Sequence, residues 1–327
     1  MQPKMSAPRV AGLWLLVLAS CLAVGESKMR GFNFNGYIAG PLATNVPSAA
    51  TYGRVMDISP AGVDPIGAPW WGHLHLGPGV YNWTALDIIV AAMRQENPDI
   101  CLLFPIWGTP TWLASDQKSC VAGDVCSSLV FQSFPGSNSL PVSIDHWKEF
   151  ITALVNRYSV QQGVFYAYEI WNEPTNMMFL NHTSASFTSK DWQFLAEMQY
   201  EAHSIIKTLT RNVAKTPCLH STDPSLIGTY VLAPSLIFDN NTHMVKVAGD
   251  VLQGFVDEKA AKGYSYWPMD AMTCHVYNTA RYDQSNLQNV QARQSSRLKY
   301  LAVCSAELGW GCNCGTPNIC MRLSTRH

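Results

Sequence analysis

Residues 164–174 read VFYAYEIWNEP, and this stretch decides how the chain is organised. An apolar and aromatic run leads into Asn172, Glu173 and Pro174, so a carboxylate stands where a buried strand should end. Ionised groups are costly to remove from water and seldom lie beside a core unless they are paired or used. The stretch therefore predicts a buried strand that carries Glu173 to a functional edge.

Similar apolar runs recur along the chain, with helix-like segments between them. The runs lie at 31–38, 53–59, 100–106, 164–171, 229–236, 269–277 and 300–308, and amphipathic stretches lie at 82–96, 144–158 and 190–209. This alternation predicts parallel strands with helices outside, and the wide spacing suits a barrel with long loops after its strands. The sequence has no G-x-G-x-x-G and no P-loop lysine motif, which argues against a nucleotide-binding fold. We expect one α/β domain with a (β/α)8 TIM-barrel architecture.

The composition excludes some classes of partner. The 327 residues carry a formal net charge of −1, so there is no electrostatic basis for binding nucleic acid or an anionic membrane. With 11 Trp, 13 Tyr and 12 Phe, the chain has enough aromatic rings for stacking surfaces as well as for a core. No G-x-S-x-G elbow supports a serine hydrolase. No metal or organic cofactor is implied, and the oligomeric state is open.

The N-terminal residues 1–25 have the pattern of a secretory signal peptide. Lys4 and Arg9 precede the apolar run AGLWLLVLASCLAV, and the small residues 23–25 suit signal peptidase. The run is short for a membrane span, so no stable membrane insertion is expected. Three N-x-S/T sequons, at Asn82, Asn181 and Asn240, favour a eukaryotic secretory route. We expect a secreted glycoprotein whose domain spans 26–327, the alternatives being a lipid anchor at Cys21 and a lysosome-like compartment.

The cysteines give two kinds of expectation. Cys120 and Cys126 bracket a loop-like VAGDV segment and can form a disulfide. Cys101, Cys274 and Cys304 lie in apolar strand-like runs, where we expect buried free thiols. The spacing in CNCGTPNIC, residues 312–320, matches no common zinc pattern.

A second acid stands at the end of another strand-like run. Glu307 closes the apolar part of AVCSAELGWG, residues 302–311. In a parallel α/β barrel the carboxyl ends of the strands form the active site, so Glu173 and Glu307 would face one mouth. Glycoside hydrolysis requires such a pair, because one acid protonates the leaving oxygen while the other attacks the sugar carbon or activates water.

Several segments of the sequence resemble those of a known group of enzymes. WNEP at 171–174, CHVY at 274–277 and AELGWG at 306–311 resemble the retaining glycoside hydrolases of clan A. PGVYNWTALDIIV at 78–90 and GTPTWLAS at 108–115 are also similar to segments of that clan, so the resemblance covers most of the mature chain. Glycoside hydrolase family 39, with β-xylosidases and α-L-iduronidases, is the most similar, and family 5 is next.

The resemblance implies roles for particular residues. Glu173 matches the general acid/base and Glu307 the nucleophile, while Asn172 matches an asparagine that binds the sugar 2-hydroxyl. His275 and Tyr277 stand two positions apart, on one face of a strand, and are similar to groups that contact the catalytic carboxylates. In a retaining enzyme the two carboxyl groups stand about 5–5.5 Å apart.

Other expected sugar contacts follow from residue type. Trp310 is the main candidate for a sugar platform, and Trp107 and Trp112 are weaker ones. Arg54 is expected to pair with Glu307 and keep the nucleophile ionised. Glu169 lies deeper in the same strand as Glu173, where a structural pairing is expected. The carbohydrate, its linkage and endo or exo action stay open.

The residues after Glu307 do not continue the barrel pattern. A (β/α)8 barrel needs an eighth strand and helix there, and residues 308–327 do not have the pattern of either. We expect a C-terminally incomplete barrel, with truncation favoured over a gap filled by the N-terminal segment or an inactive isoform. The predicted function is a secreted retaining glycoside hydrolase of β-linked oligo- and polysaccharides. The alternative is a non-catalytic carbohydrate-binding protein on a degenerate barrel.

Overall fold

A parallel sheet forms the centre of the molecule. The computed structural model describes residues 31–34, 52–55, 69–119, 134–184, 186–213, 228–237, 242–275, 314–316 and 319–320. Five strands pair side by side in the order β1 (Gly31–Phe34), β2 (Tyr52–Val55), β5 (Cys101–Ile106), β6 (Phe165–Ile170) and β7 (Tyr230–Leu232). Every pairing in this sheet is parallel. The parallel α/β architecture expected from the apolar runs is confirmed.

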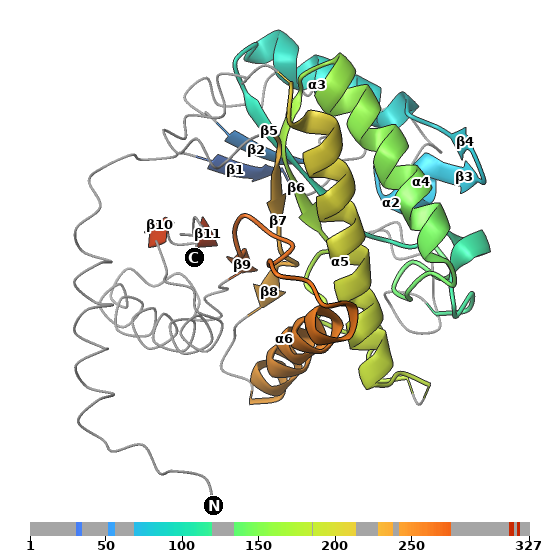
Figure 1. Ribbon diagram of the computed structural model, residues 1–327. Coiled ribbons are helices and arrows are strands. Elements are labelled where there is room, and N and C mark those ends of the chain that lie inside the picture. Colours follow the sequence, from blue (N-terminus) through green and yellow to red (C-terminus); the bar gives the residue numbers. More distant parts are fainter. Residues whose placement is uncertain are drawn as a thin grey trace, which may run out of the picture.

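The parallel arrangement continues beyond β7. A bridge joins Leu232 to Ala271, and β8 (Leu236–Ile237) pairs in parallel with β9 (Cys274–His275). Figure 1 shows β7, β8 and β9 following the sheet away from β6. The first six expected strands are therefore present in parallel order, with the fifth divided into β7 and β8. The seventh, at 300–308, lies outside the described residues, and closure into a barrel stays a prediction.

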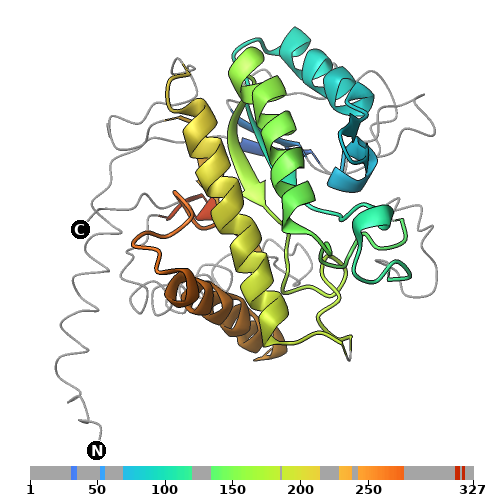
Figure 2. The same ribbon diagram turned by 45° about the vertical axis from the view of Figure 1, so that its right-hand side comes forward.

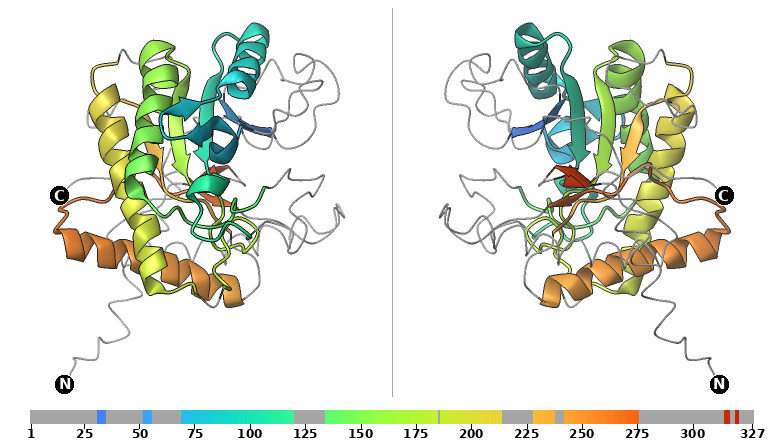
Figure 3. Two further views of the ribbon diagram at one scale, coloured as in Figure 1. Left: turned by 90° about the vertical axis from the view of Figure 1, so that its right-hand side faces the viewer. Right: turned by 90° about the vertical axis from the view of Figure 1, so that its left-hand side faces the viewer.

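The long helices cover one face of this sheet. They are α3 (Thr84–Glu96), α4 (Ile144–Val155), α5 (Ser189–Thr210) and α6 (Thr242–Lys262). Figures 1 and 3 show α3, α4 and α5 on the same side of the sheet, with α6 running across the end of α5. The first three helices confirm the amphipathic stretches. Sequence analysis did not predict α6, which contains two glycines and has only a weak apolar stripe. Among the described residues, no helix is both long enough and apolar enough to cross a membrane.

Shorter elements fill the connections. They are α2 (Trp71–Leu74), the hairpin strands β3 (His75–Gly77) and β4 (Val80–Tyr81), a 3-10 turn at Thr111–Leu113, a π turn at Asn156–Gln161 that extends α4, and the antiparallel pair β10 (Cys314–Thr316) and β11 (Ile319–Cys320). The helix α5 begins with a capping box, because the Thr188 backbone N–H donates to Asp191 Oδ2 at 2.7 Å.

The alternation of side chains along the strands separates two apolar clusters. On β5, Leu102, Phe104 and Ile106 belong to the large core between sheet and helices. Cys101 and Leu103 belong to a second cluster, together with Tyr166, Ala167, Leu232 and Ala271. Successive residues of a strand point to opposite faces, so Cys101 and Leu103 lie on the face away from the core that contacts α3, α4 and α5. A barrel places its interior on that face.

The expectation of a free thiol at Cys101 is wrong. Cys101 is buried, as its apolar surroundings suggested, but it is disulfide-bonded. An apolar sequence context indicates that a cysteine is buried and does not show whether a second cysteine pairs with it. Cys120 and Cys126 lie outside the described residues, as does residue 304.

The crossing of α5 and α6 depends on one glycine. Figure 2 shows α6 passing close to the beginning of α5. A Cβ atom at Gly254 would lie 2.6 Å from the Trp192 backbone carbon and oxygen, which is closer than packing permits. At Gly249, on the same helix, a Cβ atom would have no other atom within 4 Å.

These two glycines provide a matched pair of variants. Gly254→Ala should destabilise the protein by about 1–3 kcal/mol, because the helices must separate to admit the methyl group. Gly249→Ala should instead stabilise it by up to about 1 kcal/mol, because alanine restricts the unfolded chain and favours helix. Urea denaturation of both variants measures the difference. Equal effects of the two substitutions would show that α5 and α6 do not cross closely at Gly254.

His75, the first residue of β3, has its side chain enclosed by aromatic rings. The side chain is fully buried, and its Nδ1 accepts a hydrogen bond from Trp71 Nε1 at 3.1 Å. The ring stacks on Tyr81 and Phe150, with centroid separations of 5.1 and 5.6 Å. Burial lowers the pKa of His75 to about 4, although the nearby Glu149 opposes the shift. The imidazole is therefore neutral in the folded protein at neutral pH.

Stability should consequently fall in mildly acidic solution. The unfolded chain takes up a proton at His75 near its ordinary pKa of 6.5, whereas the folded protein takes it up only near 4. Between these values the unfolded state binds more protons, so His75 makes unfolding easier by about 2 kcal/mol on going from pH 7 to pH 5. His75→Phe should remove this part of the slope in urea unfolding measured at both pH values. An unchanged slope would contradict the neutral buried imidazole.

Candidate active site

The turn after β6 has an unusual backbone. Trp171 has φ 69° and Glu173 has φ 43°, and these are the non-glycine residues with positive φ among the described part of the chain. The left-handed region costs an ordinary L-residue about 1–2 kcal/mol. Such strain gathers at functional sites, where the surrounding structure holds it in place.

Packing and hydrogen bonds hold the turn. Trp171 is fully buried, its backbone N–H donates to the Ile106 carbonyl at 2.8 Å, and its Nε1 donates to the Phe179 carbonyl at 3.0 Å. The Glu173 carbonyl accepts the N–H of Asn176 at 2.8 Å. The end of β6 is thus fixed to β5 on one side and to its own following loop on the other.

A buried ion pair lies below this turn. Arg54 on β2 and Glu169 on β6 are 6% and 1% exposed, and the guanidinium Nη2 donates to Glu169 Oε1. The Arg54 Nε lies 3.4 Å from the other carboxylate oxygen, so the contact has two points. β5 lies between the two strands, and Glu169 alternates with the core residues Tyr168 and Ile170. Both charges therefore lie on the sheet face away from the helices.

Asn172 extends the pair toward the strand end. Its Oδ1 accepts a hydrogen bond from Arg54 Nη2 at 2.8 Å, and this donor fixes which way the amide points. The side chain is fully buried, and its Nδ2 has no hydrogen-bond partner among the described residues. A buried donor without a partner costs about 1–3 kcal/mol. Such a donor needs an explanation, and a polar group of a bound ligand would be a suitable hydrogen-bond acceptor for it.

Glu173 is held from a third strand. Its backbone N–H donates to Ser235 Oγ at 3.1 Å, and Ser235 lies in the break between β7 and β8. Glu173 is only 3% exposed. Residues from β2, from the end of β6 and from the β7–β8 break therefore meet at the carboxyl edge of the sheet. Parallel α/β proteins place their active sites at this edge.

The structure brings together three of the predicted site residues. Arg54, Asn172 and Glu173 form one cluster, and the expected structural pairing of Glu169 is confirmed. Arg54 also contacts Glu169 and Asn172, because Glu169 projects from β6 on the same sheet face as Arg54. The expected pairing of Arg54 with Glu307 stays a prediction, since residue 307 lies outside the described residues.

The other predicted site residues do not join this cluster. Trp107 is 1% exposed, with ring centroids of Trp70 and Phe179 at 4.2 and 4.8 Å, so its described surroundings are those of a core residue. Trp112 is half-buried and donates from Nε1 to the His75 carbonyl at 2.9 Å. Contact of either ring with sugar stays a prediction.

The remaining site predictions fall outside the described side chains. Only the backbone of His275 is described, at the end of β9, and residues 277, 307 and 310 are not described. The separation between the two proposed catalytic carboxyl groups therefore stays a prediction, as do the roles of Tyr277, Glu307 and Trp310.

Sequence analysis missed Ser235. It lies at the end of the apolar run 229–236, directly after Pro234, which cannot donate to a neighbouring strand. A hydroxyl beside a proline inside an apolar run is a signal that the strand is interrupted there, and that signal could have identified the position. It could not have shown that the hydroxyl contacts Glu173, 62 positions away in the chain.

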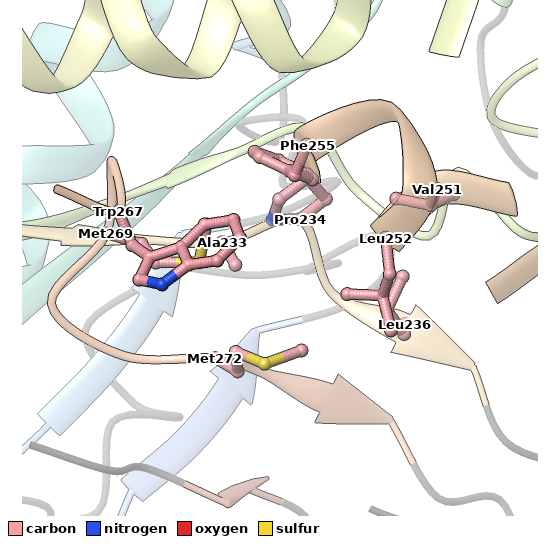
Figure 4. A pocket seen from close by; sticks show the side chains of 9 residues that line it. All are labelled: Ala233, Pro234, Leu236, Val251, Leu252, Phe255, Trp267, Met269 and Met272. Atoms are coloured by element: carbon pink, nitrogen blue, oxygen red, sulfur yellow. The ribbon is translucent and has the colours of Figure 1, made fainter. Parts of the chain in front are cut away.

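An apolar pocket elsewhere in the fold offers no catalytic group. Figure 4 shows it between α6 and the segments around β8 and β9. It is lined by Ala233, Pro234, Leu236, Val251, Leu252, Phe255, Trp267, Met269 and Met272. None of these side chains titrates, so the pocket has no acid or base for hydrolysis. Among the described side chains, no group of three or more His, Cys, Asp and Glu residues could hold a metal ion.

Comparison with solved structures finds glycoside hydrolases. A monomeric β-xylosidase from Caulobacter crescentus is 19% identical, with a TM-score of 0.45, and the match covers 76% of this chain and 41% of that one. A GH39 enzyme from Xanthomonas axonopodis pv. citri is 17% identical, with a TM-score of 0.46 and coverage of 79% and 42%. A GH10 xylanase from termite gut is 12% identical, with a TM-score of 0.40 and coverage of 86% and 53%.

The similar structures belong to the clan that the sequence motifs resemble. Glycoside hydrolases of families 39 and 10 are members of clan A. The chain spans less than half the length of the first two of these proteins. No protein-family model matches the sequence, and no curated protein matches it.

The buried ion pair can be tested by a double-mutant cycle. Arg54→Met should destabilise the protein by roughly 3–5 kcal/mol, because it leaves the Glu169 carboxylate buried without its cation. Glu169→Gln in the same chain should recover much of this loss, since the uncompensated charge is then gone. Unfolding in urea measures the two single variants and the double variant. Additive losses would show that the two side chains do not interact.

Proposed function

We propose that this chain hydrolyses O-glycosidic bonds of β-linked oligo- or polysaccharides. The observation that supports it most is the pair of groups at the end of β6. Glu173 follows Asn172 in a strained turn, and the fully buried Asn172 Nδ2 has no partner among the described residues. A carboxyl group beside an amide donor at the carboxyl edge of a parallel sheet suits a sugar and its glycosidic oxygen.

In the proposed reaction Glu173 is the general acid. Its carboxyl proton passes to the glycosidic oxygen as the bond from that oxygen to the anomeric carbon breaks. Glu307 attacks the same carbon and forms a glycosyl-enzyme, and Glu173 then removes a proton from the water that releases the sugar. The stereochemistry at the anomeric carbon is retained. Glu307 is assigned on the sequence resemblance, and Glu173 has in addition its place in the cluster described above.

Arg54 and Asn172 act together in this proposal. The guanidinium holds Asn172 Oδ1 at 2.8 Å, which leaves Nδ2 to donate to a sugar hydroxyl. A contact of this kind strengthens as positive charge develops on the sugar ring in the transition state. Because Arg54 is itself fixed by Glu169, the amide is oriented before substrate arrives, and little ordering is needed on binding.

The wider setting of the proposal comes from the sequence. Secretion after removal of residues 1–25 and a carbohydrate partner stay predictions. His275, Tyr277 and Trp310 are proposed to complete the site on the side of β9 and the segment that follows it.

The decisive experiment measures hydrolysis by the purified chain. Aryl β-xylosides, β-glucosides, β-mannosides and β-glucuronides are offered, and release of the phenol is followed by absorbance. Glu173→Gln should lower kcat/KM by about 10²–10⁴-fold on the aryl glycosides whose phenol is the most basic and therefore the poorest leaving group, which is the range for loss of a general acid. Glu307→Ala should remove activity. Glu197→Gln, which alters a carboxylate paired with Lys262 on the helical surface, should leave kcat/KM unchanged.

Two outcomes would contradict the proposal. Activity that survives both Glu173→Gln and Glu307→Ala would show that other groups perform the chemistry. A folded chain that binds oligosaccharide without hydrolysing any substrate of the panel would identify it as a non-catalytic carbohydrate-binding protein.

A further inference from the structure

The fifth strand of the sheet is broken at Ser235. β7 ends at Leu232 and β8 begins at Leu236. On the two sides of the break, the Ala233 N–H donates to the Ala271 carbonyl at 2.9 Å and the Leu236 N–H donates to the Thr273 carbonyl at 3.2 Å. Pro234, which lies between them, has no N–H to donate. The backbone therefore stays attached to the next strand while the serine side chain turns back toward β6.

The Ser235 hydroxyl lies among three polar groups of β6 and the turn that follows it. Its oxygen accepts the N–H of Glu173 at 3.1 Å. It also lies 3.0 Å from Glu169 Oε1 and 3.3 Å from Asn172 Oδ1, both of which are acceptors. A hydroxyl has one proton to donate, and the carboxylate is the nearer acceptor. Ser235 is fully buried, so the hydroxyl joins the Arg54–Glu169 pair to the Glu173 backbone without solvent.

The Glu173 N–H is a point at which the strained turn can be controlled. Glu173 has φ 43°, a conformation that ordinary residues keep only when their surroundings impose it. The dihedral angle φ of Glu173 sets the direction of its Cα–Cβ bond relative to its N–H bond. Fixing the N–H on Ser235 therefore helps to fix where the Glu173 side chain leaves the backbone.

We propose that Ser235 is a positioning residue for the catalytic acid Glu173. The proposal rests on the proposed function, because it concerns the role assigned to Glu173. Ser235 touches neither the sugar nor the transferred proton. It acts through the backbone of Glu173, and Glu169 in turn orients its hydroxyl.

A positioning role has a chemical signature that a loss of stability lacks. A general acid must stand within about 2.6–3.2 Å of the oxygen that it protonates, and a displacement of about 1 Å can cost on the order of 100-fold in rate. A leaving group that is already stable as an anion needs little protonation. Misplacement of Glu173 should therefore slow substrates with poor leaving groups and spare activated ones.

The experiment compares two substrates of the same sugar, chosen as the one that the wild-type chain hydrolyses fastest. One carries an activated 2,4-dinitrophenyl group and the other a methyl group, and kcat/KM reports the step in which the leaving group departs. Ser235→Ala should lower kcat/KM for the methyl glycoside by roughly 30–100-fold and for the dinitrophenyl glycoside by less than about threefold. Ser235→Thr, which keeps the hydroxyl, should restore most of the loss.

A matched control separates positioning from stability. Ser159 is also buried, and its Oγ lies 3.2 Å from the Phe165 carbonyl and 2.8 Å from Tyr168 Oη, at the opposite end of β6. Ser159→Ala should lower the melting temperature and leave the ratio of the two kcat/KM values unchanged. Should Ser235→Ala fail to fold, Ser235→Cys is measured in its place, because its thiol has a similar shape and its sulfur is a poor acceptor for the Glu173 N–H.

Each outcome decides the matter. A selective loss on the methyl glycoside supports the proposal. An equal loss of kcat/KM on both substrates, or no loss on either, overturns the positioning role of Ser235. The role of Glu173 as general acid is then still tested separately by Glu173→Gln. If the wild-type chain hydrolyses no glycoside at all, the proposed function fails first and the role of Ser235 fails with it.

Discussion

The site depends on one interaction, the buried ion pair between Arg54 and Glu169. The two charges come from strands that are separated by β5, so their contact spans three neighbouring strands at the carboxyl edge of the sheet. The same guanidinium orients Asn172, and the same carboxylate lies 3.0 Å from the Ser235 hydroxyl. A buried pair of this kind adds little net stability compared with apolar residues of similar size. Its value here is that it defines where three other polar groups lie.

The apolar runs of the sequence were sufficient to predict the sheet. β5 and β6 are buried on both faces, and predominantly apolar runs of this length, rich in aromatic and branched residues, favour such strands. Helix α6 escaped prediction because its packing against α5 depends on Gly254, and glycine normally counts against a helix. The contact between Arg54 and Glu169 was also not predicted. It depends on strand order and on which face each residue takes, and both are long-range properties.

The candidate site was predictable in part for a similar reason. Glu173 and Asn172 could be singled out because polar residues at the end of an aromatic strand conflict with their surroundings in the sequence itself. Ser235 shows no such conflict beyond its proline neighbour, and its importance comes from a contact made across the sheet. Trp107 shows why residue type alone is ambiguous, since an aromatic residue after a strand fits a sugar platform and a core equally well, and its described neighbours are aromatic core residues.

The left-handed backbone at Trp171 limits which residues can stand there. Glycine would relieve the strain at this position but would remove a fully buried indole and its hydrogen bond to the Phe179 carbonyl. A smaller apolar residue would lose the packing and keep the strain. Strain and packing at position 171 therefore oppose each other, and we expect each of these replacements to lower stability.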